Sequence, residues 1–196
     1  PVKRVLTSIP SLFPQAHAEY CQAGQKWNWD GVDFQVLNPQ AGSVYQDNNS
    51  SCILQIGPPG SRTLLTGDIE AAVEQDLVAR YGQVLAAQIL QVPHHGSKTS
   101  STLDFLQQVQ PKYALFSEGY FNRFHFPAPA VLQRYQSMSS ISWLTSVNGA
   151  IKIKVNPHKP LIVITAARAN FTDVDPSSEK VFLRKLAFLR YNLRHE

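Results

Sequence analysis

Two strand ends in the chain carry side chains that can bind a metal ion. The segment LLTGD (64–68) ends an apolar run in Asp68, and LQVPHH (90–95) ends another in His94 and His95. A carboxylate oxygen and an imidazole nitrogen together suit zinc, manganese or iron. Loops at strand ends can approach a ligand while the sheet behind them stays rigid. These two segments therefore predict a metal site where two neighbouring strands end.

Each of the two segments also has a purely structural explanation. A Gly-Asp pair after a strand is often a turn whose aspartate caps the next helix, and a helix is expected after Asp68. One histidine of the adjacent pair could instead form a hydrogen bond in the core. The combination is more specific than either part, because a single predicted helix separates the two strand ends.

The elements that would position these residues follow from apolar periodicity and from turn residues. Strands are predicted at 31–39, 51–57, 62–68, 87–93 and 112–119. Helices are predicted at 69–82, after a capping box from Ser101 to Asp104, and at 127–138. The Asn148-Gly149 pair is a strong hairpin signal and predicts two paired strands across 141–155. This order of elements favours a mixed α/β layer fold.

The composition indicates one folded domain and excludes several classes of protein. The chain has 196 residues, of which 43% are hydrophobic and 16% are charged. This is enough apolar surface to bury one core, and too little charge for a disordered tail. No apolar run approaches the ~20 residues of a membrane span. The net charge of +4 mildly favours an anionic partner.

The cysteine spacing excludes two common motifs. Cys21 and Cys52 do not form a Cys-x-x-Cys pair, which excludes a zinc ribbon and a thioredoxin motif. They could be two buried thiols or one disulfide, and a disulfide would require an oxidising compartment.

The character of the chain changes after Val155. The apolar run LIVITAA (161–167) predicts a further strand, and a polar linker follows it. Residues 179–196 predict a helix with one apolar face and basic residues on its other faces. Such a helix either docks on the domain or touches a membrane surface or nucleic acid. We therefore divide the chain into a domain at 1–156 and a linker with a basic amphipathic helix at 157–196.

Several longer segments resemble one family in their order and combination. They are CQAGQKWNWDGVDFQVLNP (21–39), NNSSCIL (48–54), LLTGDIEAAVEQDL (64–77), LQVPHHGSKTSST (90–102) and GYFNRFHFPAPAVLQRY (119–135). Together they resemble the C-terminal metallo-β-lactamase-like domain of ComEC/Rec2, the DNA-internalisation competence protein. The resemblance covers residues 1 to about 155.

The resemblance implies a fold and a function. The fold is an α/β protein, a metallo-β-lactamase-like αβ/βα sandwich, of which this chain would be the C-terminal part. Family members are inner-membrane proteins that pass single-stranded DNA into the cytoplasm, and this domain is thought to degrade the strand that is not imported. The domain would lie on the periplasmic face of the inner membrane. Its partners would be DNA and the membrane-channel part of the same protein, with no small-molecule cofactor.

The same resemblance implies roles for the residues at the two strand ends. Asp68 would lie between two divalent metal ions, zinc or manganese, and His94 would be the last ligand. His95 and Ser97 would be catalytic, in the loop that Gly96 shapes. The ions and a bridging hydroxide would supply the nucleophile and neutralise charge on a phosphodiester.

One part of the family's pattern is missing from this chain. The superfamily's main ligand cluster, a His-x-His-x-Asp-His type of motif, has no counterpart here, and His17 stands alone as an expected surface histidine. Asp68 and the histidine pair provide too few ligands for a tight site. Either the first half of the domain lies outside this chain, which the missing initiator methionine favours, or the protein has lost the metal.

The segment NRFHFP supplies further candidates. Many relatives have a histidine directly before the proline, where this chain has Phe126, so His125 is a doubtful ligand. Asn122, Arg123 and Lys98 are candidates for contact with nucleic-acid phosphates, for which arginine is well suited. A structural salt bridge is an alternative role for the arginine.

Two tryptophans and the two cysteines complete the set of candidate residues. Trp27 and Trp29, beside Lys26, could stack on bases or could pack on the core at the edge of a strand. For Cys21 and Cys52 the resemblance implies a disulfide, because a domain outside the membrane would lie in an oxidising compartment.

The sequence supports two main competing functions, and a third, weaker one is another hydrolase on the same fold, such as an esterase. The first is a metal-dependent hydrolase, a DNA nuclease or phosphodiesterase that acts during uptake when the full domain is present. The second is an incomplete lactamase-like module that binds DNA or docks on the transporter without cutting. A histidine-rich motif upstream in the natural protein would favour the enzyme, and its absence there would favour the binding module.

Overall fold

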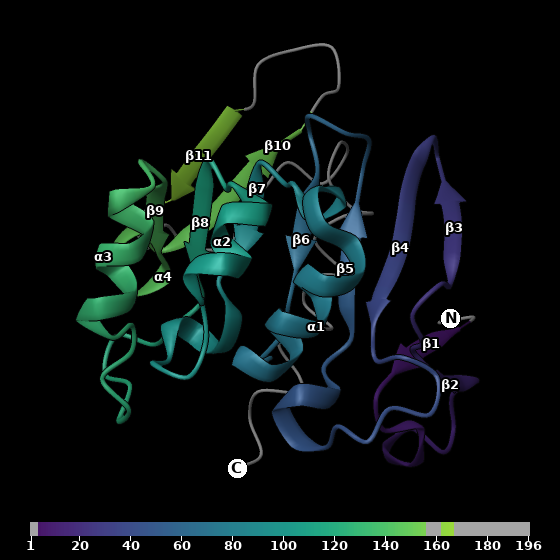
Figure 1. The fold of residues 1–196 in the computed structure, drawn as a ribbon. Helices are drawn as coiled ribbons and strands as arrows, with labels where there is room; N and C mark the ends of the chain where they lie inside the picture. Colours follow the sequence, from purple (N-terminus) through teal and green to yellow (C-terminus); the bar gives the residue numbers. More distant parts are fainter. Residues whose placement is uncertain (1–3, 156–161, 167–196) are drawn as a thin grey trace.

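A seven-stranded mixed sheet forms the centre of the chain, and helices cover one of its faces (Figure 1). The computed structural model describes residues 4–155 and 162–166. In spatial order, the strands of this sheet are β3 (Lys26–Trp29), β4 (Val32–Asn38), β5 (Ile53–Ile56), β6 (Thr63–Leu65), β7 (Ile89–Gln91), β8 (Tyr113–Phe116) and β9 (Ile141–Leu144). Neighbours from β3 to β6 are antiparallel, whereas neighbours from β6 to β9 are parallel.

The other described elements are short. Two small sheets have two strands each, β1 (Val5–Thr7) with β2 (Ala18–Tyr20) and β10 (Ala150–Lys154) with β11 (Ile162–Ala166). The α-helices are α1 (Ala71–Tyr81), α2 (Leu103–Val109), α3 (Pro129–Ser137) and α4 (Thr145–Asn148). Four 3-10 helices lie at Pro10–Leu12, Asp47–Ser50, Gly82–Leu85 and Pro93–Gly96.

The core lies between the sheet and the helices. α1, α2 and α3 lie on the same face of the sheet (Figure 1). Both layers contribute fully buried side chains, such as Leu64 and Leu90 from β6 and β7, Phe105 from α2 and Tyr135 from α3. Burial of an aliphatic or aromatic side chain of this size stabilises a fold by about 1.5–3 kcal/mol. The parallel strands are therefore held rigidly from one side.

The strands and the helix expected around the candidate metal site are present. The strand before Asp68 is β6, the strand before His94 is β7, and α1 lies between them in sequence. Because β6 and β7 are parallel neighbours, their C-terminal ends lie side by side at one edge of the sheet. The predicted mixed α/β layer fold is confirmed.

The hairpin predicted across 141–155 is wrong. β9 pairs with β8 and β10 pairs with β11, while α4 lies between β9 and β10. Two side chains favour the helical turn. Oγ1 of Thr145 donates to the carbonyl oxygen of Glu118 at 2.7 Å, and Oδ1 of Asn148 accepts from the backbone N–H of Leu144 at 2.9 Å. Gly149 then ends α4 with a φ of 74° instead of forming a hairpin turn.

The capping box predicted from Ser101 to Asp104 is also wrong. The residue before α2 is Thr102, whereas Ser101 adopts a φ of 59°. The cap comes from Glu74 of α1, whose carboxylate accepts from the backbone N–H groups of Ser101 at 2.6 Å and Thr102 at 2.7 Å. Such bonds satisfy donors that the start of a helix leaves free. A cap supplied by another helix leaves no signal in the local sequence.

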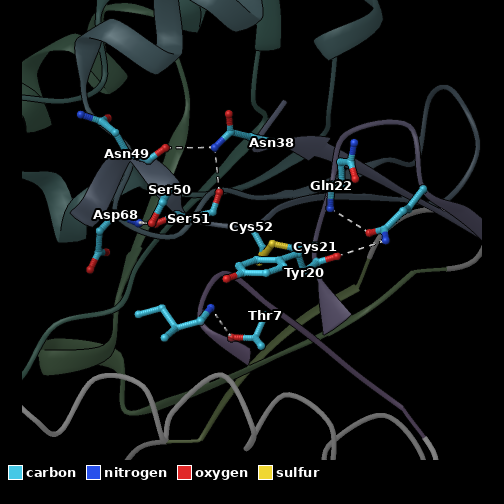
Figure 2. The surroundings of a disulfide bond; sticks show 12 residues. Thr7, Tyr20, Cys21, Gln22, Asn38, Asn49, Ser50, Ser51, Cys52 and Asp68 are labelled. Carbon is cyan, nitrogen blue, oxygen red and sulfur yellow. Dashed lines mark hydrogen bonds between the residues drawn. A yellow bond between two sulfur atoms is a disulfide. The ribbon is translucent and has the colours of Figure 1, made fainter. Parts of the chain in front are cut away.

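A disulfide joins Cys21 and Cys52, the pairing that the family resemblance implies (Figure 2). It connects the end of β2 to the residue before β5, across 31 positions of the sequence. Beside it, Nδ2 of Asn38 donates to the carbonyl oxygens of Asn49 at 3.1 Å and Ser51 at 2.9 Å. The segment before β5 is therefore fixed by one covalent bond and two hydrogen bonds.

The structure describes the predicted second segment, 157–196, only at 162–166. There β11 pairs with β10 across the predicted boundary. The linker and the basic helix predicted after it lie outside the described residues, and the division of the chain stays a prediction. Among residues 4–155 and 162–166, no helix has both the length and the apolar character needed to cross a membrane.

Loss of the disulfide should lower the stability of the chain. The bond closes a loop across 31 positions and restricts the unfolded chain. We therefore expect replacement of both cysteines by serine to lower the free energy of unfolding by about 2–4 kcal/mol, measured by urea denaturation. Dithiothreitol should cause a similar loss in the wild type and none in the variant. An equal response of the two chains would contradict this role of the bond.

Candidate functional site

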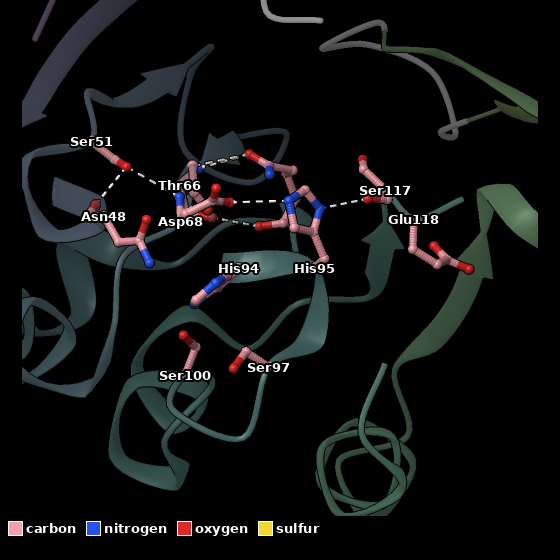
Figure 3. Close-up of polar contacts among 12 residues, drawn as sticks. Asn48, Ser51, Thr66, Asp68, His94, His95, Ser97, Ser100, Ser117 and Glu118 are labelled. Carbon is pink, nitrogen blue, oxygen red and sulfur yellow. Dashed lines mark hydrogen bonds and ion pairs between the residues drawn. The ribbon is translucent and has the colours of Figure 1, made fainter. Parts of the chain in front are cut away.

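The predicted metal-binding residues meet at the edge where the parallel strands end. Asp68 follows β6, His94 and His95 follow β7, and Ser117 follows β8 (Figure 3). Ligand sites of open α/β sheets commonly lie at the carboxyl ends of the strands. The sheet therefore brings together an aspartate, two histidines and a backbone carbonyl that are distant in sequence.

His95 is the histidine that faces Asp68. Its Nδ1 lies 2.5 Å from the carbonyl oxygen of Ser117, and its Nε2 lies 3.4 Å from Oδ1 of Asp68 (Figure 3). Because a carbonyl oxygen can only accept, Nδ1 carries a proton and donates it. Nε2 is therefore the ring nitrogen directed at the carboxylate. The geometry favours His95 over His94 as the partner of Asp68.

Two acceptors face each other when the ring of His95 is neutral. A metal ion placed between Nε2 and the carboxylate of Asp68 would bind both acceptors. In a tetrahedral zinc site, bonds of about 2.0–2.2 Å place two donor atoms roughly 3.4 Å apart. The separation of 3.4 Å in the structure matches this spacing. A histidine that binds a metal usually donates its other N–H to a carbonyl or carboxylate, as His95 does.

His94 faces a different carboxylate. Its Nδ1 lies 3.4 Å from Oε1 of Glu70 and 3.4 Å from Oγ1 of Thr99. The threonine hydroxyl in turn donates to Oε1 of Glu70 at 3.1 Å. The side chains of His94 and Glu70 are 20% and 33% exposed, so solvent reaches this cluster. The role of His94 as the last metal ligand stays a prediction.

The turn that carries both histidines has an uncommon backbone. His94 and His95 have φ values of 48° and 55°, in the left-handed region that favours glycine. Such conformations cost about 1–3 kcal/mol each and occur most often at functional sites. Two backbone hydrogen bonds connect the turn to its neighbours. The N–H of His94 donates to the carbonyl oxygen of Gly67 at 3.1 Å, and the N–H of Ala128 donates to the carbonyl oxygen of Gly96 at 2.9 Å.

Close packing against the loop before α3 also holds this turn. A Cβ at Gly96 would lie 2.6 Å from Cβ of Pro127 and 3.0 Å from Cε1 of Phe116. The ring of Phe126, next to that proline, lies 5.7 Å from the ring of His94 and 6.5 Å from the ring of His95. Only glycine therefore fits at position 96, and one aromatic ring restricts both imidazoles.

Residues from other parts of the chain fix the backbone around Asp68. Oγ of Ser51 accepts from its N–H at 3.2 Å (Figures 2 and 3). Oε1 of Gln91 accepts from the backbone N–H groups of Thr66 at 3.1 Å and Gly67 at 3.2 Å, just before Asp68. Ser51 is the neighbour of Cys52, so the disulfide anchors the segment that supports the aspartate.

Glu74 fixes the loop that follows the histidine turn. Burial raises the pKa of Glu74 above its ordinary value, and hydrogen bonds from Thr102 and Ser101 partly oppose this. Arg134 donates to two carbonyl oxygens of the same loop, at 3.0 and 2.9 Å. Burial also raises the pKa of Tyr135, whose hydroxyl lies 3.0 Å from Oγ of Ser101. This buried network gives the histidine turn a rigid base.

The two residues after Gly96 differ in exposure. Ser97 is 6% exposed, and its Oγ lies 3.1 Å from Oγ1 of Thr99. Its backbone N–H donates to the carbonyl oxygen of His94 at 2.8 Å and closes the turn. Lys98 is exposed. The catalytic role of Ser97 and the nucleic-acid contact of Lys98 stay predictions.

The remaining candidate phosphate contacts lie in the loop between β8 and α3. Asn122 uses its side chain within the loop, donating to the carbonyl oxygen of Phe126 at 2.8 Å and accepting from its N–H at 2.7 Å. Arg123 is exposed, with its guanidinium carbon 4.7 Å from the ring centre of Phe124. His125 is exposed and lines an open hollow of the same loop. The structure thus gives Asn122 a structural role and places Arg123 at the surface.

Trp27 and Trp29 lie in the edge strand β3, at the antiparallel end of the sheet. Trp27 stacks on Phe34 of β4 with ring centres 5.2 Å apart, and Trp29 lies 6.4 Å from the same ring. Both indoles are half-buried, which agrees with packing at a strand edge. His17 is exposed, as expected for a surface histidine.

The described part of the chain holds an incomplete ligand set. Within residues 4–155 and 162–166, no group of three or more histidine, cysteine, aspartate or glutamate side chains is arranged to hold a metal ion. Asp68 and His95 supply two donors, whereas a closed tetrahedral site needs four. The pair therefore fits a metal ion only as part of a larger set.

Four residues that position the site are absent from the sequence predictions: Ser117, Gln91, Ser51 and Phe126. Ser117 lies near the end of the strand predicted at 112–119, but it acts through its backbone carbonyl oxygen, which no side-chain pattern identifies. Gln91 and Ser51 act through hydrogen bonds to the backbone of the turn after β6. Contacts of that kind leave no local pattern in the sequence.

Comparison with known proteins relates the chain to one superfamily and to a set of long proteins. A family model described as the Metallo-beta-lactamase superfamily matches residues 6–117. The chain is 41% identical to "Competence protein ComA" of Neisseria gonorrhoeae over 135 residues, which are 69% of the chain and 19% of that protein. It is 34% identical to "Recombination protein 2" of Haemophilus influenzae over 172 residues, 88% of the chain and 21% of that protein. It is 40% identical to "ComE operon protein 3" of Bacillus subtilis over 123 residues, 63% of the chain and 16% of that protein. The chain thus spans between 16% and 21% of the length of these curated relatives.

The packing around Gly96 predicts that a larger side chain is not tolerated there. In Gly96→Ala the new Cβ meets Pro127 and Phe116, and a φ of 86° is strained for any residue with a Cβ. We expect the free energy of unfolding, measured by urea denaturation, to fall by about 2–4 kcal/mol.

Gly119→Ala is the matched control, because a Cβ there meets nothing within 4 Å. Its effect should stay within about 0.5 kcal/mol. Equal small effects of the two substitutions would contradict the close packing of the histidine turn.

Proposed function

Because the chain belongs to the metallo-beta-lactamase superfamily, we propose that it acts as a metal-dependent phosphodiesterase on DNA within a DNA-uptake protein. It would degrade the DNA strand that is not imported. The observation that carries the proposal is the Asp68–His95 pair, whose donor atoms lie 3.4 Å apart at the edge of the sheet. This is a spacing at which one metal ion can bind both atoms.

The relatives support the DNA-uptake context. The names "Competence protein ComA" and "Recombination protein 2" belong to proteins that are 41% and 34% identical to the chain. The resemblance to the metallo-β-lactamase-like domain of ComEC/Rec2 is therefore confirmed. DNA as the substrate, the membrane-channel part as a partner, and a position on the outer face of the inner membrane belong to the proposal. The Cys21–Cys52 disulfide supports an oxidising compartment.

The chain would hold divalent metal ions, zinc or manganese, with its strand-end residues. Asp68 and His95 would bind one ion, and the carbonyl of Ser117 would keep Nε2 of His95 directed at it. His94 and Glu70 form a second nitrogen–oxygen pair with the same 3.4 Å separation, and they are the candidates for a second ion. When bound, the ions would activate a water molecule and neutralise charge on the phosphodiester.

Other residues of the chain would bind and position the DNA. Lys98, two residues after Gly96, and Arg123, in the loop between β8 and α3, are exposed cations. They would attract the DNA backbone, and the guanidinium group can bind a phosphate through two hydrogen bonds. Ser97 would keep the histidine turn closed through its backbone hydrogen bond to His94.

A second function is supported by the incomplete ligand set. Within the described ranges, Asp68 and His95 are not joined by a third ligating side chain. If the natural protein supplies no further ligand, this lactamase-like module would bind DNA or dock on the transporter without cutting.

Metal content and hydrolysis test the proposal directly. Metal per chain is measured by elemental analysis, and hydrolysis is measured with labelled DNA and with bis(p-nitrophenyl) phosphate. Both are carried out on this chain and, where the natural protein extends upstream, on a form that includes that part. We expect Asp68→Asn to lower metal affinity about tenfold or more and to abolish hydrolysis, because the carboxylate is a direct ligand.

Three matched variants sharpen this test. Asp104→Asn changes an exposed aspartate of α2 and should leave metal content and hydrolysis unchanged. His95→Asn and His94→Asn introduce the same residue at neighbouring positions with similar backbone φ, and asparagine tolerates that region. The loss of metal should be larger for His95→Asn. DNA binding without metal or hydrolysis in every form would reject the enzyme and favour the binding module.

A further inference from the structure

We propose that the loop between β8 and α3 binds unpaired bases and leads single-stranded DNA to the Asp68–His95 pair. This inference rests on the proposed function and specifies that the DNA substrate is single-stranded. We call residues 119–126 the aromatic loop. The proposal is carried by the exposure of its rings, by their order relative to the histidines and by the charge of the loop itself.

The aromatic loop exposes three large rings within five residues. Phe121 is 91% exposed, Tyr120 is 63% exposed and Phe124 is 59% exposed. Exposure of this much aromatic surface is unfavourable in water unless a partner covers it. Nucleic-acid bases are flat apolar partners that stack on such rings without regard to sequence.

The rings form a row that runs from the surface to the candidate site. Phe124 stacks on Phe126 with ring centres 5.5 Å apart and an interplanar angle of 20°. Phe126 stacks in turn on His95 with ring centres 6.5 Å apart and an angle of 21°. A base placed on the outer ring would therefore continue a row that ends at the imidazole facing Asp68.

The aromatic loop has a defined conformation before any partner binds. The side chain of Asn122 bonds both the N–H and the carbonyl group of Phe126, at 2.7 and 2.8 Å. The backbone carbonyl oxygen of Asn122 accepts from the N–H of His125 at 3.1 Å. Preorganised rings lose little conformational entropy on binding, which favours affinity.

The charge around the aromatic loop suits a polyanion. The aromatic loop contains Arg123 and no aspartate or glutamate, and the carboxylate of Glu118 just before it accepts hydrogen bonds from Thr145 and Ser146. The guanidinium group of Arg123 lies over the ring of Phe124, 4.7 Å from its centre. A cation beside exposed rings can bind a phosphate while a neighbouring base stacks.

Two features favour unpaired over paired bases. The bases of a duplex are stacked on one another, so their faces cannot reach an exposed side chain, and a duplex would use only the cation. The row of rings also ends at the proposed metal-binding pair, so a strand held by stacking would place its backbone near that pair. A membrane surface would not require this connection to the histidines.

Binding of labelled single strands tests the inference without any metal. The full chain is titrated with a fluorescent oligothymidylate and with a duplex of the same length, in the presence of a chelator. We expect the double substitution Phe121→Ala, Phe124→Ala to weaken single-strand binding about tenfold or more and to change duplex binding less than about twofold. Arg123→Gln should weaken the binding of both the single strand and the duplex. It should also reduce the slope of log K against log salt concentration by about the amount expected for one phosphate contact.

Controls separate stacking from other effects. Tyr20→Ala removes a ring that is 67% exposed in β2 and should leave both affinities unchanged. Urea denaturation of each variant shows whether it is folded. Equal weakening for single strand and duplex, or no weakening for either, overturns the inference. So does binding to vesicles of phosphatidylcholine and phosphatidylglycerol that the double substitution abolishes while DNA binding persists.

The outcome is distinguishable from that of the proposed function. If the double variant keeps its hydrolysis of bis(p-nitrophenyl) phosphate and loses only the preference for single strands, the loop acts on the substrate as proposed. If single-strand binding does not depend on the rings while metal-dependent hydrolysis is present, this inference fails and the proposed function stands.

Discussion

The hydrogen bond from Nδ1 of His95 to the carbonyl of Ser117 is the contact on which the candidate site depends. It fixes the proton on one ring nitrogen and thereby directs the other at Asp68, 3.4 Å away. Without it the ring could turn or exchange tautomers, and the aspartate would face a donor in one state and an acceptor in the other. The bond is possible because β7 and β8 are parallel neighbours, so the residues after them meet at the same edge.

The surroundings of this edge show that its geometry is held from several sides. Glu74 fixes the loop after the histidines from within the core, and Ser51, anchored by the disulfide, fixes the backbone before Asp68. Gly96 allows the loop before α3 to approach closely, which brings Phe126 onto both imidazoles. A turn with two left-handed histidines is strained, and these contacts are what keep it in place. The same loop carries the exposed rings, so the residues proposed to bind DNA pack directly against the residues proposed to bind metal.

Much of the fold could be predicted from the sequence, because apolar runs and turn residues report locally on strands and helices. Such local signals predict the strand ends at Asp68 and at the histidine pair, and α1 between them. The order of the motifs identifies the superfamily. The errors arose where contacts distant in sequence decide the structure. Asn148-Gly149 ends a helical turn because Thr145 bonds to Glu118, and Ser101 is no cap because Glu74 supplies one. The sequence favours His94 as the last metal ligand, and that role stays a prediction. The bond between His95 and Ser117 could not be predicted, because it joins residues that are distant in sequence.

We propose that His95, held by Ser117, is the histidine that shares a metal ion with Asp68. The most direct measurement is ¹⁵N NMR of the histidine rings during titration with Zn²⁺, in the wild type and in Asp68→Asn. We predict that Nδ1 of His95 is protonated throughout, that Zn²⁺ shifts Nε2 of His95, and that the substitution removes this shift. An unprotonated Nδ1, a first response at His94, or a His95 response that persists in Asp68→Asn would contradict the claim.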